Sequence, residues 1–192
     1  MQTLITGCGR SGTRYMAALL HRCKVNIGHE EFKGRGLVSW IHAPVCDDYQ
    51  LVLRQLRNPR LVASSFGLLA RKQSSWDLVN RFIKQQFNVD MPDHTQYPLE
   101  AGVAYCYFWN KYLDYHVEYT YRIEDIAKEL PKILELLNIN TSQSVINSAI
   151  VTTPRVGGKL IKKGFEYYTW DDISKVPYGD ELIKFADRWG YL

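Results

Sequence analysis

Short runs of apolar residues recur along the chain at spacings that alternate between strand and helix periods. Residues 3–6, 25–28, 50–56 and 117–123 predict strands, and residues 12–22, 61–71, 76–87, 99–116, 142–150 and 180–189 predict helices. After the last strand we expect a helical region that Pro131 interrupts. Residues 151–170 show little periodicity and predict a loop. The alternation is typical of an α/β fold, a three-layer sandwich with a mostly parallel central sheet.

Length and composition narrow the class of protein. The 192 residues suit one domain, residues 1–192, and they show no repeat or linker. A net charge of +4 suits an anionic ligand but is too weak and scattered to indicate nucleic acid. No run reaches the roughly 20 apolar residues of a membrane span, and Arg10 and Arg14 interrupt any leader. We therefore expect a cytoplasmic protein without membrane contact; the pattern carries no signal of oligomeric state.

The cysteines give a further expectation. Cys8, Cys23, Cys46 and Cys106 show no C-x-x-C spacing and no matched histidine pair. We therefore expect no metal site and four reduced thiols, as in a cytoplasmic compartment.

A glycine-rich loop, residues 7–14, follows the first strand and opens the first helix. Its glycines allow positive φ angles and a close approach of the backbone to a ligand. The helix start offers N–H groups and the positive end of a dipole, and Arg10 and Arg14 add full charges. The loop predicts a binding site for phosphate or sulfate.

This loop fits more than one known pattern. Gly7, Gly9 and Gly12 match the dinucleotide fingerprint, with Glu30 about 20 residues further on. Cys8 and Arg14 have the spacing of the phosphate loop of cysteine phosphatases. The triphosphate P-loop is not matched, because Thr13 stands where its lysine belongs and Arg14 replaces the Mg²⁺-binding hydroxyl.

A second polar cluster follows the strand at residues 50–56. Arg57 directly follows that strand, Asn58 is a good N-cap and Pro59 is a good first helical residue. Three predicted strands are therefore each followed directly by a segment with charged or polar residues: residues 7–14, residues 29–31 and Arg57-Asn58. Ligands of parallel sheets bind at the carboxyl ends of the strands, so a single pocket could collect all three.

Two separated segments resemble sulfotransferases. Residues 6–17 resemble the 5′-phosphosulfate loop of that superfamily, and residues 57–66 resemble its 3′-phosphate motif. In that motif an arginine at a strand end and a serine eight residues later hold the 3′-phosphate of 3′-phosphoadenosine-5′-phosphosulfate (PAPS). Arg57 and Ser65 match the pair in identity and spacing, and residues 121–126 and 186–191 give shorter matches.

The resemblance implies a P-loop-NTPase-like sulfotransferase fold and transfer of a sulfuryl group from PAPS, without a metal, to a hydroxyl group. The product nucleotide would be 3′-phosphoadenosine 5′-phosphate (PAP), and the acceptor a carbohydrate or small molecule. By resemblance Arg10, in place of a lysine, would stabilise charge on the bridging oxygen. The 5′-phosphate would be held by Gly9, Arg10, Ser11, Gly12 and Thr13.

Three roles stay open at this point. Arg14 either adds a phosphate ligand or lies on the helix surface. Glu30 is our first choice for the base that activates the acceptor, and His29 the second, because both follow a predicted strand end. The basic residues of the segment 155–164 either close over the nucleotide or form a solvated loop.

Three other functions compete with this hypothesis. The chain could be a nucleotide-binding domain of the same fold without catalysis. A Rossmann-type dinucleotide-binding protein predicts a longer chain and gives no role to Arg10, Arg57 or Ser65. A phosphatase using Cys8 and Arg14 lacks the usual hydroxyl after the arginine and a later Asp-Pro motif.

Overall fold

The computed structural model describes residues 2–66, 73–153 and 167–192, which group into two compact units. Unit 1 contains the chain up to Gly7, Ser11–Leu56 and the described part of His116–Gly164. Unit 2 contains Cys8–Arg10, Arg57–Tyr115 and the described part of Phe165–Leu192. The single domain expected over residues 1–192 stays a prediction.

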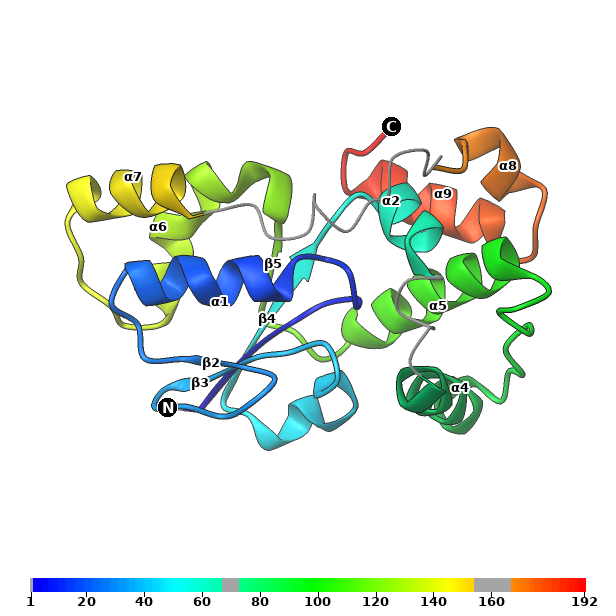
Figure 1. Cartoon of the computed structure of the whole chain (residues 1–192), viewed down its shortest axis with the longest axis horizontal. Helices are drawn as coiled ribbons and strands as arrows, with labels where there is room; N and C mark the ends of the chain where they lie inside the picture. Colours follow the sequence, from blue (N-terminus) through cyan, green and yellow to red (C-terminus); the bar gives the residue numbers. More distant parts are fainter. Residues whose placement is uncertain (1, 67–72, 154–166) are drawn as a thin grey trace. The chain divides into compact units, whose positions relative to one another are not determined.

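Unit 1 is built on a parallel β-sheet (Figure 1). The strands are β1 (Thr3–Thr6), β2 (Gly28–His29), β3 (Gly36–Val38), β4 (Leu51–Leu56) and β5 (Tyr119–Arg122), in the spatial order β2-β3-β1-β4-β5. All pairings between these strands are parallel. β1, β3 and β4 are buried along their whole length, as expected for strands of a parallel sheet. The predicted α/β class with a parallel central sheet is confirmed.

Three helices cover one face of this sheet (Figure 1). They are α1 (Thr13–Arg22), α6 (Ile126–Leu136) and α7 (Gln143–Thr152); two short 3₁₀ helices, η1 (Ala43–Asp48) and η2 (Ile123–Asp125), precede β4 and α6. The core between helices and sheet is mainly aliphatic, with Ile5, Leu53, Leu20 and Leu130 among its members. Burial of these side chains fixes α1 against β1, and therefore holds the two ends of the loop that joins them.

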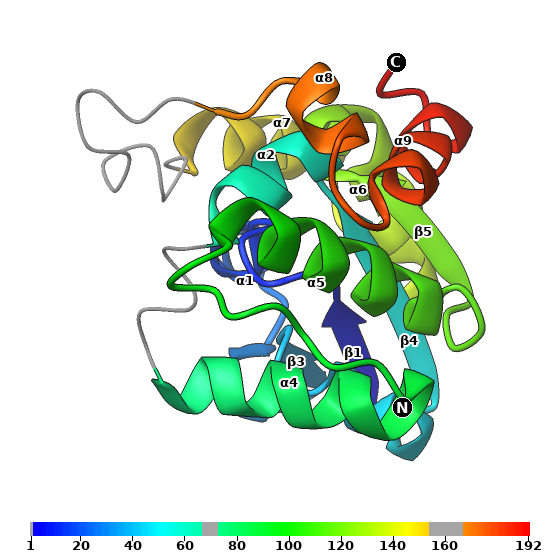
Figure 2. The ribbon, with the colours of Figure 1, turned by 90° about the vertical axis from the view of Figure 1, so that its right-hand side faces the viewer.

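Unit 2 is helical (Figure 2). Its helices are α2 (Pro59–Ser64), α4 (Gln73–Phe87), α5 (Pro98–Leu113), α8 (Trp170–Ser174) and α9 (Gly179–Arg188). Aromatic rings fill its core: the centroids of Phe66 and Tyr105 are 4.9 Å apart, as are those of Phe82 and Trp109. α2 lies close to α5 at Gly102, where a Cβ atom would lie 2.3 Å from the Ala63 carbonyl oxygen.

Several predicted elements differ from the structure. The strand expected at residues 25–28 pairs only over Gly28–His29, and β3, η1 and α8 were not predicted. The helix expected at residues 61–71 has the predicted N-cap Asn58 and first residue Pro59, but its described part ends at Ser64. Pro131 does not interrupt α6, because the buried face of that helix, with Leu130, Ile133 and Leu134, outweighs one lost backbone hydrogen bond.

Candidate functional site

The carboxyl ends of β1 and β4 lie side by side in the sheet. Thr6, the last residue of β1, pairs with Arg54 of β4, and β4 continues two residues further to Leu56. From β1 the chain continues to β2 and β3 on one side, whereas β5 follows β4 on the other side. Such a reversal of strand order opens a crevice at the carboxyl ends, the usual ligand site of open parallel sheets. The glycine-rich loop leaves β1 at this place.

Within unit 1, Gln55 holds the glycine-rich loop against β4. Its side-chain Nε2 donates to the Ser11 carbonyl oxygen at 2.7 Å, and Tyr121 donates its hydroxyl to Gln55 Oε1 at 3.1 Å. A Cβ atom on Gly7 would lie 2.2 Å from the Gln55 carbonyl oxygen, so only glycine allows this approach. Gln55 was not among the predicted site residues, although a polar residue inside a buried apolar strand is a visible signal.

The start of α1 is open to an anion. Its N-cap is Gly12, with φ of 101°, which has no side chain to cap the helix. The first N–H groups of a helix lack intrahelical partners, and the dipole is positive at this end. The Ser11 hydroxyl is buried, 1% of the residue being exposed, and Oγ has no hydrogen-bond partner within the described residues. A phosphate oxygen would satisfy that hydroxyl.

Within unit 2, two groups hold the middle of the loop. The Gly9 N–H donates to the Tyr105 hydroxyl at 2.5 Å, and Arg57 Nη1 donates to the Arg10 carbonyl oxygen at 2.9 Å. Arg10 itself has φ of 75°, a left-handed conformation that residues other than glycine adopt only when their surroundings enforce it. The guanidinium of Arg57, the residue that follows β4, therefore lies at the middle of the glycine-rich loop.

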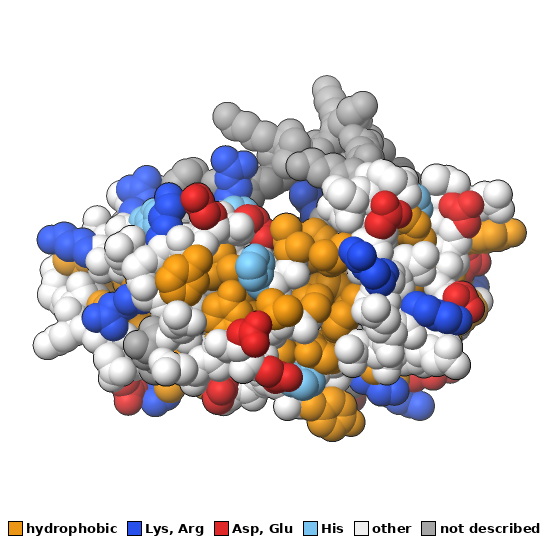
Figure 3. Space-filling model, turned by 90° about the horizontal axis from the view of Figure 1, so that it is seen from below, with side chains coloured by type: hydrophobic (Ala, Val, Ile, Leu, Met, Phe, Trp, Pro, Cys, Tyr) orange, Lys and Arg blue, Asp and Glu red, His pale blue; other side chains and the backbone are white. Residues whose placement is uncertain are grey.

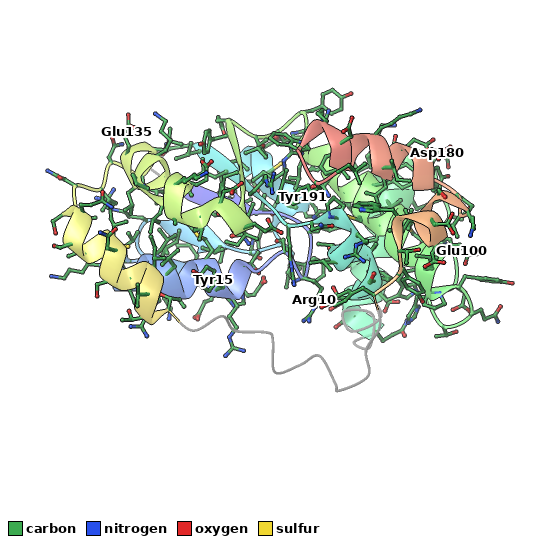
Figure 4. The ribbon with its side chains drawn as sticks, turned by 90° about the horizontal axis from the view of Figure 1, so that it is seen from above. Arg10, Tyr15, Glu100, Glu135, Asp180 and Tyr191 are labelled. Carbon is green, nitrogen blue, oxygen red and sulfur yellow. The ribbon has the colours of Figure 1, made fainter. Side chains whose placement is uncertain are left out.

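Arg10, which is labelled in Figure 4, has a positively charged side chain and is half-buried. Burial lowers the pKa of Arg10, the neighbouring Arg57 charge lowers it further, and Tyr167 opposes the shift. Arg10 Nε is buried without a hydrogen-bond partner in the described part of the chain. Two neighbouring cations and an unpartnered buried donor are typical of an anion site. A bound anion reduces the repulsion between the two cations and accepts a hydrogen bond from the buried donor.

Ser65 lies at the far end of α2 from Arg57. Asn58 caps this helix by accepting from the Arg60 N–H at 3.0 Å, and Pro59 occupies the first turn, as predicted. Ser65 is the C-cap and is buried, with its hydroxyl donating to the Val62 carbonyl oxygen at 3.1 Å. Its oxygen keeps lone pairs for another donor, but a phosphate contact requires the hydroxyl to rotate away from Val62.

Glu30 and His29 lie at the carboxyl end of β2. Ser39 donates its hydroxyl to Glu30 Oε2. Burial raises the pKa of Glu30, although hydrogen bonds from Ser39 and the Trp40 backbone act in the opposite direction. A carboxylate with a raised pKa is a better proton acceptor near neutral pH than an ordinary glutamate. Glu31, by contrast, is exposed and lies 3.9 Å from Lys33 Nζ.

His29 contacts both Glu30 and the start of α1. Its Nε2 is 3.4 Å from Thr13 Oγ1 and 3.7 Å from Glu30 Oε1. Burial lowers the pKa of His29, and the Arg14 charge lowers it further, so the imidazole is neutral at neutral pH. The contact with Glu30 is therefore not a charge pair. Arg14 itself is exposed on α1.

The Cys8 thiol belongs to a buried cluster in unit 2. Cys8 is 3% exposed, Asn110 Nδ2 donates to its Sγ at 3.1 Å, and the thiol donates to the Cys106 carbonyl oxygen at 3.9 Å. Cys8 is therefore a buried structural thiol, whereas a nucleophilic cysteine is partly exposed. The basic residues of the segment 155–164 lie outside the described residues.

Comparisons with known proteins support the fold. No family model matches the chain, and no curated protein matches it. Among solved structures, the chain is similar to mouse sulfotransferase SULT7A1 complexed with PAP, with 14% identity and a TM-score of 0.52. The match covers 97% of this chain and 88% of the mouse chain. The chain therefore has the sulfotransferase fold.

None of the helices described here has the length and apolar character required to cross a bilayer.

Proposed function

We propose that this protein is a sulfotransferase that moves a sulfuryl group from PAPS to a hydroxyl of a carbohydrate or small-molecule acceptor. The observation that carries the proposal is the bond from Arg57 Nη1 to the Arg10 carbonyl oxygen at 2.9 Å. It joins the arginine of the segment that resembles a 3′-phosphate motif to the loop that resembles a 5′-phosphosulfate site, and this contact supports the proposal. Two cationic groups so arranged suit a nucleotide with phosphate at both ends.

In this proposal the loop holds the 5′-phosphate. The N–H groups at the start of α1 and the unpartnered Ser11 hydroxyl supply donors there. Thr13 adds a second hydroxyl, which already lies 3.4 Å from His29 Nε2. Arg57 and Ser65 hold the 3′-phosphate, the first through a planar fork of N–H donors.

Arg10 acts electrostatically. PAPS supplies the sulfuryl group, and negative charge grows on the bridging oxygen as that group leaves. A guanidinium whose pKa is lowered by burial and by Arg57 still stays protonated, so it stabilises this charge without giving up its proton.

Glu30 accepts the proton of the acceptor hydroxyl. Burial raises its pKa, which suits it to this role, and the bond from Ser39 holds the carboxylate in place. Ser39 fixes the carboxylate rotamer, and the neutral His29 orients Thr13. Arg14, exposed on α1, has no role in this mechanism.

The test is transfer of label from ³⁵S-labelled PAPS to a panel of sugars and small hydroxyl compounds. Glu30→Gln should lower transfer about 10²–10⁴-fold, the usual contribution of a general base, with PAP binding retained. Glu31→Gln is the matched control, because Glu31 is an exposed neighbour, and it should leave transfer unchanged.

One outcome contradicts the enzyme proposal, and another contradicts the choice of Glu30 as the base. Tight PAP binding without transfer to any acceptor would show that the chain is a nucleotide-binding domain without catalysis. Full transfer activity in Glu30→Gln, with loss in His29→Ala, would assign the base to His29 instead.

A further inference from the structure

A second cluster of chemically active side chains lies at the opposite edge of the sheet of unit 1. η1 ends just before β4, and His116 lies just before β5. β4 and β5 are parallel neighbours, with Leu53 paired to Tyr119, so the segments that enter them meet at one edge. The Val52 N–H donates to Glu118 Oε2 at 2.6 Å and the Glu118 N–H donates to the Val52 carbonyl oxygen at 3.0 Å, which fixes the two segments to each other.

Three potential metal ligands converge there. Cys46 Sγ, a carboxylate oxygen of Asp47 and a ring nitrogen of His116 all lie within 4.8 Å of one another. Asp47 Oδ1 is 2.9 Å from His116 Nδ1, and Cys46 Sγ is 4.0 Å from Asp47 Oδ1. Figure 3 views the molecule from below and shows acidic and histidine side chains next to each other on this side.

We propose that Cys46, Asp47 and His116 bind a zinc ion. Thiolate, carboxylate and imidazole are the three ligand types that zinc takes in proteins. Zinc bonds of about 2.0–2.3 Å place tetrahedral ligand atoms roughly 3.3–3.8 Å apart. The observed separations of 2.9 and 4.0 Å lie on either side of that range, so small side-chain rotations complete the site.

The burial of the three ligands suits an ion that enters from solvent. Cys46 is fully buried, the His116 side chain is 25% exposed and the Asp47 side chain is 77% exposed. The ion would lie with the thiolate on its inner side and a fourth position open to water. Binding releases the Cys46 proton, because only the thiolate coordinates.

The position of the site indicates its role. It joins the end of η1 to the segment before β5, at the amino ends of the strands, whereas the glycine-rich loop follows the carboxyl end of β1. Zinc there stabilises unit 1 and takes no part in anion binding. The proposal is therefore independent of the sulfotransferase proposal.

The test uses the full chain, stripped of metal by a chelator and titrated with Zn²⁺ by calorimetry and with Co²⁺ by absorption spectroscopy. We expect one ion per chain, a thiolate-to-Co²⁺ charge-transfer band and a higher melting temperature with Zn²⁺. His116→Asn and Asp47→Asn change partly exposed side chains and should fold; each should weaken Zn²⁺ binding by ~10-fold or more.

Asp48→Asn is the matched control, because Asp48 is the exposed carboxylate next in the chain, and it should bind Zn²⁺ as the wild type does. Cys46→Ser should abolish the charge-transfer band. No binding at micromolar Zn²⁺, or unchanged affinity in both His116→Asn and Asp47→Asn, would overturn the site. A charge-transfer band that persists in Cys46→Ser would overturn it as well.

Discussion

The two edges of the sheet in unit 1 differ in the ligands that they suit. At the carboxyl edge, the start of α1 and Ser11 offer donors to an anion. At the amino edge, Cys46, Asp47 and His116 offer donor atoms to a cation. Parallel strands joined by helices place helix N-termini, with positive dipole ends, at the carboxyl edge. The direction of the strands therefore favours anions at one edge, whereas the cation site depends on side chains alone.

The largest expected effect on stability is at the carboxyl edge. Gly7→Ala places a Cβ atom 2.2 Å from the Gln55 carbonyl oxygen, which forces the loop away from β4. We expect a loss of about 1–3 kcal/mol in the free energy of unfolding, together with loss of PAP binding. Urea unfolding followed by circular dichroism measures the first effect. Asp48→Ala, an exposed position at the amino edge, should stay within about 0.5 kcal/mol of the wild type.

A smaller change at the same edge separates binding from stability. Ser11→Ala removes a buried hydroxyl whose Oγ has no partner in the described part of the chain. We expect the free protein to be unchanged or more stable by up to about 1 kcal/mol, while PAP binds more weakly. Thermal melts with and without PAP measure both effects.

Ser65→Ala serves as a contrast, because it removes the bond to the Val62 carbonyl oxygen and should lower stability. A Ser11→Ala protein that is less stable than the wild type would show that Ser11 has a structural partner.

The smallest effect is a pH dependence set by Glu30. Burial raises the pKa of Glu30, so the folded protein favours the protonated form more than the unfolded chain does. The stability that this group contributes is present at low pH and is lost as pH rises through its folded pKa. Relative to Glu30→Gln, the wild type should therefore lose stability as pH rises above the ordinary glutamate range. Urea midpoints measured for both proteins across pH test this, and a constant difference would show that the carboxyl pKa is not raised.

The two edges also show what the sequence could predict. β1, β4 and α1 follow from local periodicity, and the glycine-rich loop is a contiguous motif. Gln55, Ser39 and Tyr105 act on that loop or on Glu30 from other elements, so only tertiary structure reveals them. Their contacts were not predicted for that reason, although Gln55 interrupts an apolar strand.

The amino edge was harder to predict. Cys46 and Asp47 are about 70 residues from His116, so no short spacing indicates a metal site. They meet because β4 and β5 are neighbours in the sheet, and strand order is not contained in local periodicity. The same applies to β3, a strand of three residues that gives too short a signal.

The most direct test of the account compares the binding of PAP and AMP, which differ by the 3′-phosphate, by calorimetry. In the wild type we expect PAP to bind at least ~10-fold more tightly, since a hydrogen bond to a charged group contributes about 1.5–3 kcal/mol. Arg57→Ala should lose this preference. Arg60→Ala should keep it, because Arg60 bonds instead to the Tyr168 carbonyl oxygen. Equal affinity of the wild type for PAP and AMP, or a preference that survives in Arg57→Ala, would contradict the proposal that Arg57 holds the 3′-phosphate.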